Sequence, residues 1–231
     1  MDFSGSFFSD FLPWLPALLL LGATSGILAG LLGVGGGIVI VPALLFLFQV
    51  MGYGGEALMH MSVGTSLGVI IFTGLSSARA HYKRGGVDFG LVRQIGAGII
   101  LGVIISSMLA AVLSGQVLTI IFASIMVALA GVMLYDPARV FPARRMFSKV
   151  VNGFTGVIIG MISTLVGMGG ATLSVGSLRA QGLEMVRAVG TASALGLVIS
   201  IPAAAGFMMI GAGESGRLPL SVGYVNIAAL L

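Results

Sequence analysis

The stretch Gly33-Val34-Gly35-Gly36-Gly37 interrupts one apolar segment of the sequence, and Gly167-Met168-Gly169-Gly170-Ala171 interrupts another. Each glycine in a helix interior costs about 1 kcal/mol relative to alanine, so adjacent glycines predict a break in the helix. At membrane depth, such exposed backbone is tolerated only against protein or a polar cavity. Because the pattern occurs twice, we expect a binding site between two related halves of the chain.

The composition indicates a membrane protein. Of 231 residues, 58% are hydrophobic and 8% are charged, and the mean hydropathy is +1.15, whereas about 25% of the residues of a soluble domain are charged. Several apolar stretches exceed the roughly 20 residues that cross a bilayer. The sequence therefore predicts an all-α, polytopic membrane protein. The absence of cysteine from the sequence excludes disulfides and thiolate metal sites.

The apolar stretch 15–50 is too long for one crossing. As a single helix it would measure roughly 54 Å, against a hydrocarbon core of about 30 Å. We therefore expect a hairpin that is broken at Gly33–Gly37. Further helices are expected at about 57–80, 93–113, 117–135, 150–166, 171–178 and 188–211, with a last one from 219.

Two segments that follow the glycine runs resemble each other. Val63-Gly64-Thr65-Ser66 in the first half matches Val189-Gly190-Thr191-Ala192-Ser193 in the second. We therefore expect one transmembrane domain, residues 1–231, with repeat halves at about 13–135 and 150–231.

The basic residues predict how the halves lie in the membrane, because lysine and arginine concentrate in cytoplasmic loops. If 15–50 and 150–178 are hairpins, only Arg217 of the 11 basic residues lies outside the cell, and the halves are inverted. If they are single crossings, Arg179 and Arg187 lie outside instead. We favour inverted halves. The same distribution explains the net charge of +4 without nucleic acid as a partner.

Helix breaks inside a membrane place helix N-termini, with about half a positive charge each, where they can hold an anion. In transporters with repeated halves, the substrate binds between such breaks. We expect the substrate-binding residues to be Gly33, Gly35, Gly36, Gly37, Thr65, Ser66, Gly167, Gly169, Gly170, Thr191 and Ser193, together with Arg187 and His60.

Each candidate also has a simpler interpretation. Glycines permit close helix packing, which we expect for Gly22 with Gly26 and Gly30, for Gly98 with Gly102 and for Gly156 with Gly160. A histidine that flanks a helix at the membrane interface is common, and a basic residue at a cytoplasmic helix end needs no substrate.

Catalysis is not expected. Gly64-Thr65-Ser66-Leu67-Gly68 matches the pattern of a hydrolase nucleophile, but that motif requires a strand-to-helix turn with a histidine and an acid. Two histidines 21 residues apart, with no acidic cluster, predict no metal site. We expect no catalytic residues and no cofactor.

The ordered motifs resemble the TauE/SafE family of sulfite and organosulfonate exporters. The resemblance rests on the following segments: Gly26-x3-Gly30-x2-Gly33-x-Gly35-Gly36-Gly37 with Val41-Pro42, Ser62–Ser66, Ala80–Asp88, Gly156-x3-Gly160, Val166–Gly170, Arg187–Thr191 and Gly223–Asn226. It implies a multi-pass carrier of sulfur oxyanions or sulfonates in the bacterial inner membrane. Members of the family continue for one or two more helices, so we expect the second half to lack the closing helices.

The favoured hypothesis is a secondary transporter of a small sulfur oxyanion or organosulfonate that works by alternating access. The alternative is an anion channel, or a membrane binding or regulatory subunit, that uses the same glycine-rich site. The expected partners are a small anion and the lipid bilayer, and the packing glycines also allow a homodimer.

Overall fold

The fold is described from a computed structural model, which covers residues 12–32, 36–134, 147–213, 218 and 220–230. Its elements are η2 (Leu12–Trp14), α2 (Leu15–Leu32), α3 (Gly37–Val50), α4 (Ala57–Lys83), α5 (Phe89–Val112), α6 (Gly115–Leu134), α8 (Lys149–Val166), α9 (Ala171–Ala180), α10 (Met185–Ile210), η3 (Gly211–Gly213), β1 (Ser221–Val222), β2 (Val225–Asn226) and η4 (Ala228–Leu230). The described part contains five helices that are long and apolar enough to cross a membrane, four of them α4, α5, α6 and α8, and the fifth α10 continued by η3. The chain is thus an all-α, polytopic membrane protein.

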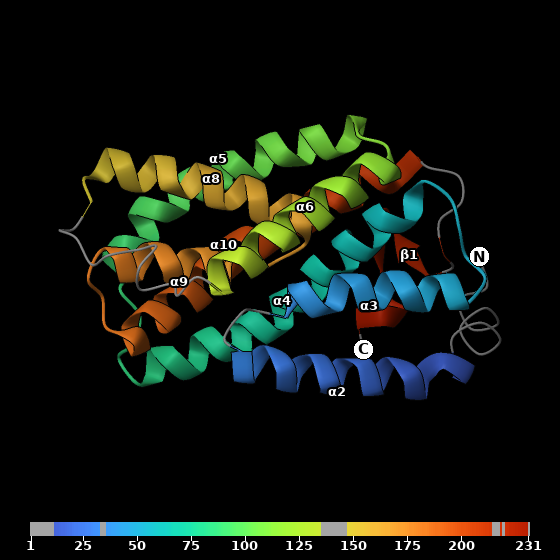
Figure 1. The fold of residues 1–231 in the computed structure, drawn as a ribbon, viewed down its shortest axis with the longest axis horizontal. Helices are drawn as coiled ribbons and strands as arrows, with labels where there is room; N and C mark the ends of the chain where they lie inside the picture. The colour runs from blue at the N-terminus through green and yellow to red at the C-terminus, as the bar shows by residue number, and fades with distance from the viewer. Residues whose placement is uncertain (1–11, 33–35, 135–146, 214–217, 219, 231) are drawn as a thin grey trace.

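Two helical hairpins enter the molecule from opposite ends (Figure 1). The first consists of α2 and α3, and the second of α8 and α9. The C-terminal ends of α4 and α9 and the N-terminal ends of α5, α8 and α10 lie together at the left of Figure 1. One hydrogen bond, from the Asn152 side chain to that of Gln94, joins the N-terminal parts of α8 and α5, and an ion pair joins Asp88 to Arg187 at the same end. Both ends of the second hairpin therefore lie on one side of the protein.

The basic side chains of the described residues gather at that side. They are Arg79, Lys83, Arg84, Arg93, Lys149, Arg179 and Arg187, which occupy the helix ends named above. Such an accumulation marks the cytoplasmic side of a membrane protein. The remaining four basic residues, Arg139, Arg144, Arg145 and Arg217, lie outside the described ranges.

Glycines fix the closest helix contact. The helices α5 and α8 run parallel, with Gly156 against the backbone of Ile95 and Gly160 against that of Ile99. A Cβ atom at Gly98 would meet the backbone of Gly153. The packing predicted for Gly98, Gly102, Gly156 and Gly160 is confirmed.

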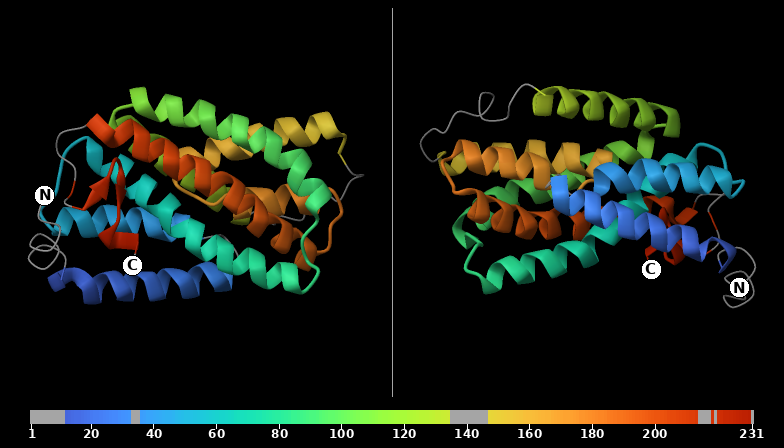
Figure 2. Two further views of the ribbon diagram at one scale, coloured as in Figure 1. Left: turned by 180° about the vertical axis from the view of Figure 1, so that it is seen from behind. Right: turned by 60° about the horizontal axis from the view of Figure 1, so that its bottom comes forward.

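Gly22 and Gly26 differ from these glycines. A Cβ atom at either position would have nothing within 4 Å among the described residues. The packing predicted for them is wrong within the described chain, because α2 contacts little besides α3. The helix α6 also lies along the outside of the bundle (Figure 2), and only 11% of its apolar window is buried.

The helix predicted from residue 219 is wrong. The chain instead forms a two-stranded hairpin, in which Ser221 pairs with Asn226 and Val222 with Val225. Gly223, at φ +57°, occupies the first position of the two-residue turn, where glycine is favoured. The hairpin folds back on the bundle because glycines admit its backbone, Gly64 of α4 lying against the carbonyl of Tyr224.

Candidate functional site

The two glycine runs meet in the middle of the molecule. A Cβ atom at Gly37, the first residue of α3, would lie 2.7 Å from Cα of Met168 and would also overlap the carbonyl oxygen of Gly167. Only glycine permits this approach, because carbon atoms in van der Waals contact are about 3.5–4.0 Å apart. Gly36 precedes this contact as a turn residue, whereas Gly33 and Gly35 lie outside the described residues.

The second run changes direction at two left-handed glycines. Gly167 has φ +68° and ends α8, and its successor Met168 donates its N–H to the Ser163 carbonyl at 2.8 Å. Glycine is the residue that most readily adopts this conformation at a helix end. Gly170, at φ +64°, is the N-cap of α9. The chain therefore leaves one helix and enters the next within four buried residues.

Ser66 of α4 holds the second run in place. Its hydroxyl donates a 2.8 Å hydrogen bond to the carbonyl oxygen of Gly167, and its side chain is fully buried. The same carbonyl is the group that Gly37 approaches. Ser66 is the predicted hydroxyl that the structure brings to the glycine runs.

The N-terminus of α9 offers unused hydrogen-bond donors. Among the described residues, the N–H groups of Gly169 and Gly170 have no acceptor, and the first amides of any helix lack intrahelical partners. The hydroxyl oxygen of Ser163 lies 3.0 Å from where a Cβ of Gly170 would be. Ser163 is fully buried, and its hydroxyl has no hydrogen-bond partner in the described part of the chain.

These groups form what we call the break site: Gly37, Ser66, Ser163, Gly167, Met168, Gly169 and Gly170. Its donors are backbone amides and a neutral hydroxyl, and the α9 dipole adds a positive potential at Gly170. Such a set can bind an anion without a positively charged side chain. Ile70 of α4 and Ile199 of α10 close on Gly169 and Gly170.

Thr65 is directed elsewhere. Its hydroxyl oxygen accepts a 2.9 Å hydrogen bond from the backbone N–H of Asn226, in the C-terminal hairpin. The residue is fully buried. Its function in the described structure is to fasten β2 to α4.

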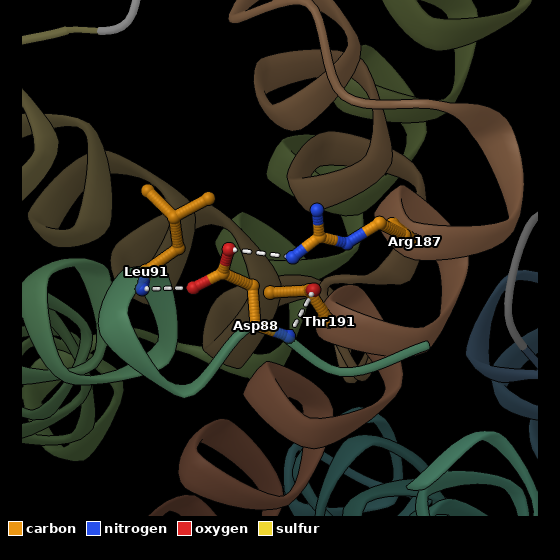
Figure 3. A network of polar contacts seen from close by, with 4 residues as sticks. All are labelled: Asp88, Leu91, Arg187 and Thr191. Atoms are coloured by element: carbon orange, nitrogen blue, oxygen red, sulfur yellow. Dashed lines mark hydrogen bonds and ion pairs between the residues drawn. The ribbon is translucent and has the colours of Figure 1, made fainter. Parts of the chain in front are cut away.

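Arg187 and Thr191 form a different cluster with Asp88 (Figure 3). Arg187 pairs with one carboxylate oxygen of Asp88 at 3.1 Å, and the other oxygen caps α5 by accepting the Leu91 N–H at 3.1 Å. The Asp88 N–H donates to the Thr191 hydroxyl at 3.0 Å. We call these three residues the Asp88 clasp. It joins the start of α5 to the start of α10, away from the break site.

Ser193 and His60 also lie outside the break site. Ser193 shares a 3.0 Å hydrogen bond with Ser77 and donates to the Val189 carbonyl. Nε2 of His60 lies 3.0 Å from the Ala110 carbonyl oxygen, and the ring stacks on Tyr224 with centroids 5.0 Å apart. At 3% exposure, His60 is buried among its protein neighbours.

Sequence reasoning missed Ser163 and Asp88. Ser163 is one of many hydroxyls in apolar segments, and only the fold shows that it adjoins the N-cap of α9. The position of Asp88 could have been noticed in the sequence, because it lies between the basic segment Lys83-Arg84 and a predicted helix. Aspartate at such a position is a favoured N-cap.

The sequence matches a known protein family. The family model described as "Sulfite exporter TauE/SafE" matches residues 18–231. The chain belongs to the TauE/SafE sulfite exporter family. The match takes in both hairpins, the break site and the clasp.

Curated relatives are membrane transporters by name. A "Probable membrane transporter protein" of Haemophilus influenzae is 33% identical over 213 residues, which cover 92% of this chain and 81% of the relative. One from Methanocaldococcus jannaschii is 29% identical and covers 96% of this chain and 82% of the relative. One from Bacillus subtilis is 48% identical over 83 residues, or 35% of this chain and 30% of the relative. No solved structure matches the chain significantly.

Proposed function

We propose that this TauE/SafE-family transporter moves a small sulfur oxyanion or organosulfonate, with sulfite as the simplest example, across the bacterial inner membrane by alternating access. The observation that carries the proposal is the break site. Two glycine runs from different halves meet there, beside the N-terminus of α9 and the unpartnered hydroxyl of Ser163.

The chemistry of the break site favours an anion. Amide and hydroxyl donors concentrate at Gly169, Gly170 and Ser163, and a low-dielectric surrounding strengthens their attraction for negative charge. An oxyanion with several acceptor oxygens would satisfy these donors together. The family description supports sulfite or a related compound as the anion.

Binding without a positively charged side chain also suits transport. A full ion pair buried in hydrocarbon is costly to form and to break, whereas backbone donors bind an anion more weakly and release it more easily. In known secondary transporters, helix N-termini at discontinuous helices perform this function.

The arrangement of α4 and α10 supports the inverted halves. These helices follow the first and second hairpins, and they run antiparallel. Ser77, near the C-terminal end of α4, meets Ser193 near the start of α10. At the other end, Gly64 lies against Phe207. Corresponding helices of two inverted repeats have this relation, and rocking one repeat against the other is the usual basis of alternating access.

Counterflow tests the transport proposal. Full-length protein is reconstituted in liposomes loaded with unlabelled sulfite under nitrogen, and radiolabelled sulfite is added outside. A carrier exchanges the two pools, so we expect the label to accumulate transiently inside above its equilibrium level. The variant Gly170→Leu, which crowds Ile199 and strains a left-handed residue, should abolish this accumulation. Gly131→Ala, with nothing within 4 Å of the new methyl among the described residues, is the matched control.

The other functions give different results. An anion channel would equilibrate the label without an overshoot, and a binding or regulatory subunit would show no flux. Thermal-shift binding across sulfite, thiosulfate, sulfoacetate and taurine then identifies the anion. Absence of both counterflow and binding for the whole set would refute the proposal.

A further inference from the structure

Many hydroxyl side chains in these helices form a hydrogen bond with their own helix backbone. Serines and threonines in a helix commonly donate to a carbonyl of the preceding turn. Here this bond is made by Thr24, Ser62, Thr73, Ser106, Thr119, Ser124, Thr155 and Ser193. They belong to α2, α4, α5, α6, α8 and α10.

Buried hydroxyls without a partner among the described residues also occur at Ser25, Ser107, Ser163, Thr164 and Ser200, but the short helix α9 carries several unpartnered polar side chains in one row. The hydroxyls of Ser174 and Ser177 have no hydrogen-bond partner among the described residues. Both polar atoms of the Gln181 side chain are also without partners there. The three residues are 0%, 9% and 3% exposed. Buried polar groups are otherwise almost always paired with protein or with water.

These three side chains lie on one face of α9. Their spacings of three and four residues place them in one row along the helix, and the same row begins at Gly170, four residues before Ser174. At 1.5 Å per residue, the row from Gly170 to Gln181 is about 16 Å long. It runs from the break site to the end of the molecule where the basic residues gather (Figure 1).

We propose that the Ser174, Ser177 and Gln181 face of α9 lines a hydrated passage between the break site and the cytoplasmic side, along which the anion moves. This inference rests on the proposed function, but it concerns the route and not the identity of the cargo. Water in the passage would supply the partners that the three side chains lack in the protein. Neutral hydroxyl and amide groups offer hydrogen bonds along the way without trapping the anion.

The natural absence of cysteine makes the passage directly testable. In the full chain, the variants Ser174→Cys and Ser177→Cys each carry a single thiol. Inside-out membrane vesicles are treated with the anionic reagent sulfonatoethyl methanethiosulfonate or with a cationic trimethylammonium reagent of similar size. Leu183→Cys is the matched buried control, since Leu183 lies beyond the end of α9 and is 9% exposed, as Ser177 is. Glu184→Cys is the exposed reference, and fluorescence-detected size-exclusion chromatography shows that each variant is folded.

We expect the thiols at 174 and 177 to react from the cytoplasmic side and the thiol at 183 to remain unmodified. After normalisation to the exposed reference, the anionic reagent should react about tenfold faster than the cationic one, since a positive potential concentrates anions. Ethanesulfonate, which does not consume the reagent as sulfite would, should slow modification at position 174.

Two results would overturn the inference. One is no modification at either position in folded variants, and the other is equal modification at 174, 177 and 183. Counterflow of the unsubstituted chain is measured in parallel. If counterflow is intact and the two thiols stay unmodified, the passage is wrong while the proposed function stands. If counterflow is absent, the proposed function fails first.

Discussion

Replacing Gly37 by alanine tests the contact between the two hairpins with a single methyl group. The new Cβ would lie 2.7 Å from Cα of Met168, about 1 Å closer than carbon atoms pack. Because the neighbour is backbone on a capped helix end, the hairpins must separate. Overpacking of this kind costs about 1–3 kcal/mol, which for a chain of this length lowers the melting temperature by about 2–12 °C.

The same strain should weaken anion binding. If the anion is held only when the hairpins meet, 1–3 kcal/mol corresponds to about 5- to 150-fold weaker binding. Alanine keeps the backbone N–H at position 37, so any loss is due to the approach of the hairpins and not to a missing donor. The assays are thermal unfolding in detergent and sulfite binding by thermal shift.

Gly26→Ala is the control, because its methyl has nothing within 4 Å among the described residues. It should be neutral, or stabilise the helix by up to about 1 kcal/mol. A Gly37→Ala protein with the melting temperature and sulfite affinity of the parent would refute the contact and the argument built on it.

Three further changes separate the break site from its surroundings. Ser163→Ala should leave the melting temperature unchanged, since the Ser163 hydroxyl has no partner among the described residues. It should weaken sulfite binding about 10- to 150-fold, as expected for the loss of a hydrogen bond to a charged ligand. Unchanged affinity would exclude Ser163 from the site. Thr65→Val removes the acceptor of the Asn226 N–H and should destabilise the protein by about 1–3 kcal/mol, which lowers the melting temperature. An unchanged melting temperature would contradict the attachment of β2 to α4 through Thr65. Arg187→Gln breaks the ion pair with Asp88, whose side chains are 52% (Arg187) and 28% (Asp88) exposed. The free energy of unfolding should therefore fall by at most about 1 kcal/mol, and sulfite affinity should be unchanged. A large loss of affinity would instead support Arg187 as an anion ligand.

The helices were predictable because their signals are local. Helices expected at about 150–166 and 171–178 are found at Lys149–Val166 and Ala171–Ala180. Apolar length sets these elements, and glycine marks the places where the backbone must turn or approach closely. The errors are a few residues at the ends, where α10 begins at Met185 rather than near 188.

The partners of individual polar side chains were not predictable. Arg187 and Thr191 suggested anion ligands because both precede or begin an apolar helix, but their partner Asp88 is about one hundred residues away in sequence. The C-terminal segment looked helical because it is apolar, and the turn at Gly223 prevailed instead. Whether a hydroxyl such as that of Ser163 finds a partner depends on the packed structure alone.

The glycine-mediated contact between α5 and α8 has a mechanical consequence. These helices belong to different halves, yet Gly156 and Gly160 bring their backbones together along several turns. Such an interface leaves little room for side chains to slide past one another, so we expect the two helices to move as one rigid body. In the proposed alternating-access cycle, we therefore expect α5 to move together with the second hairpin, and the rocking to take place between this unit and the rest of the first half.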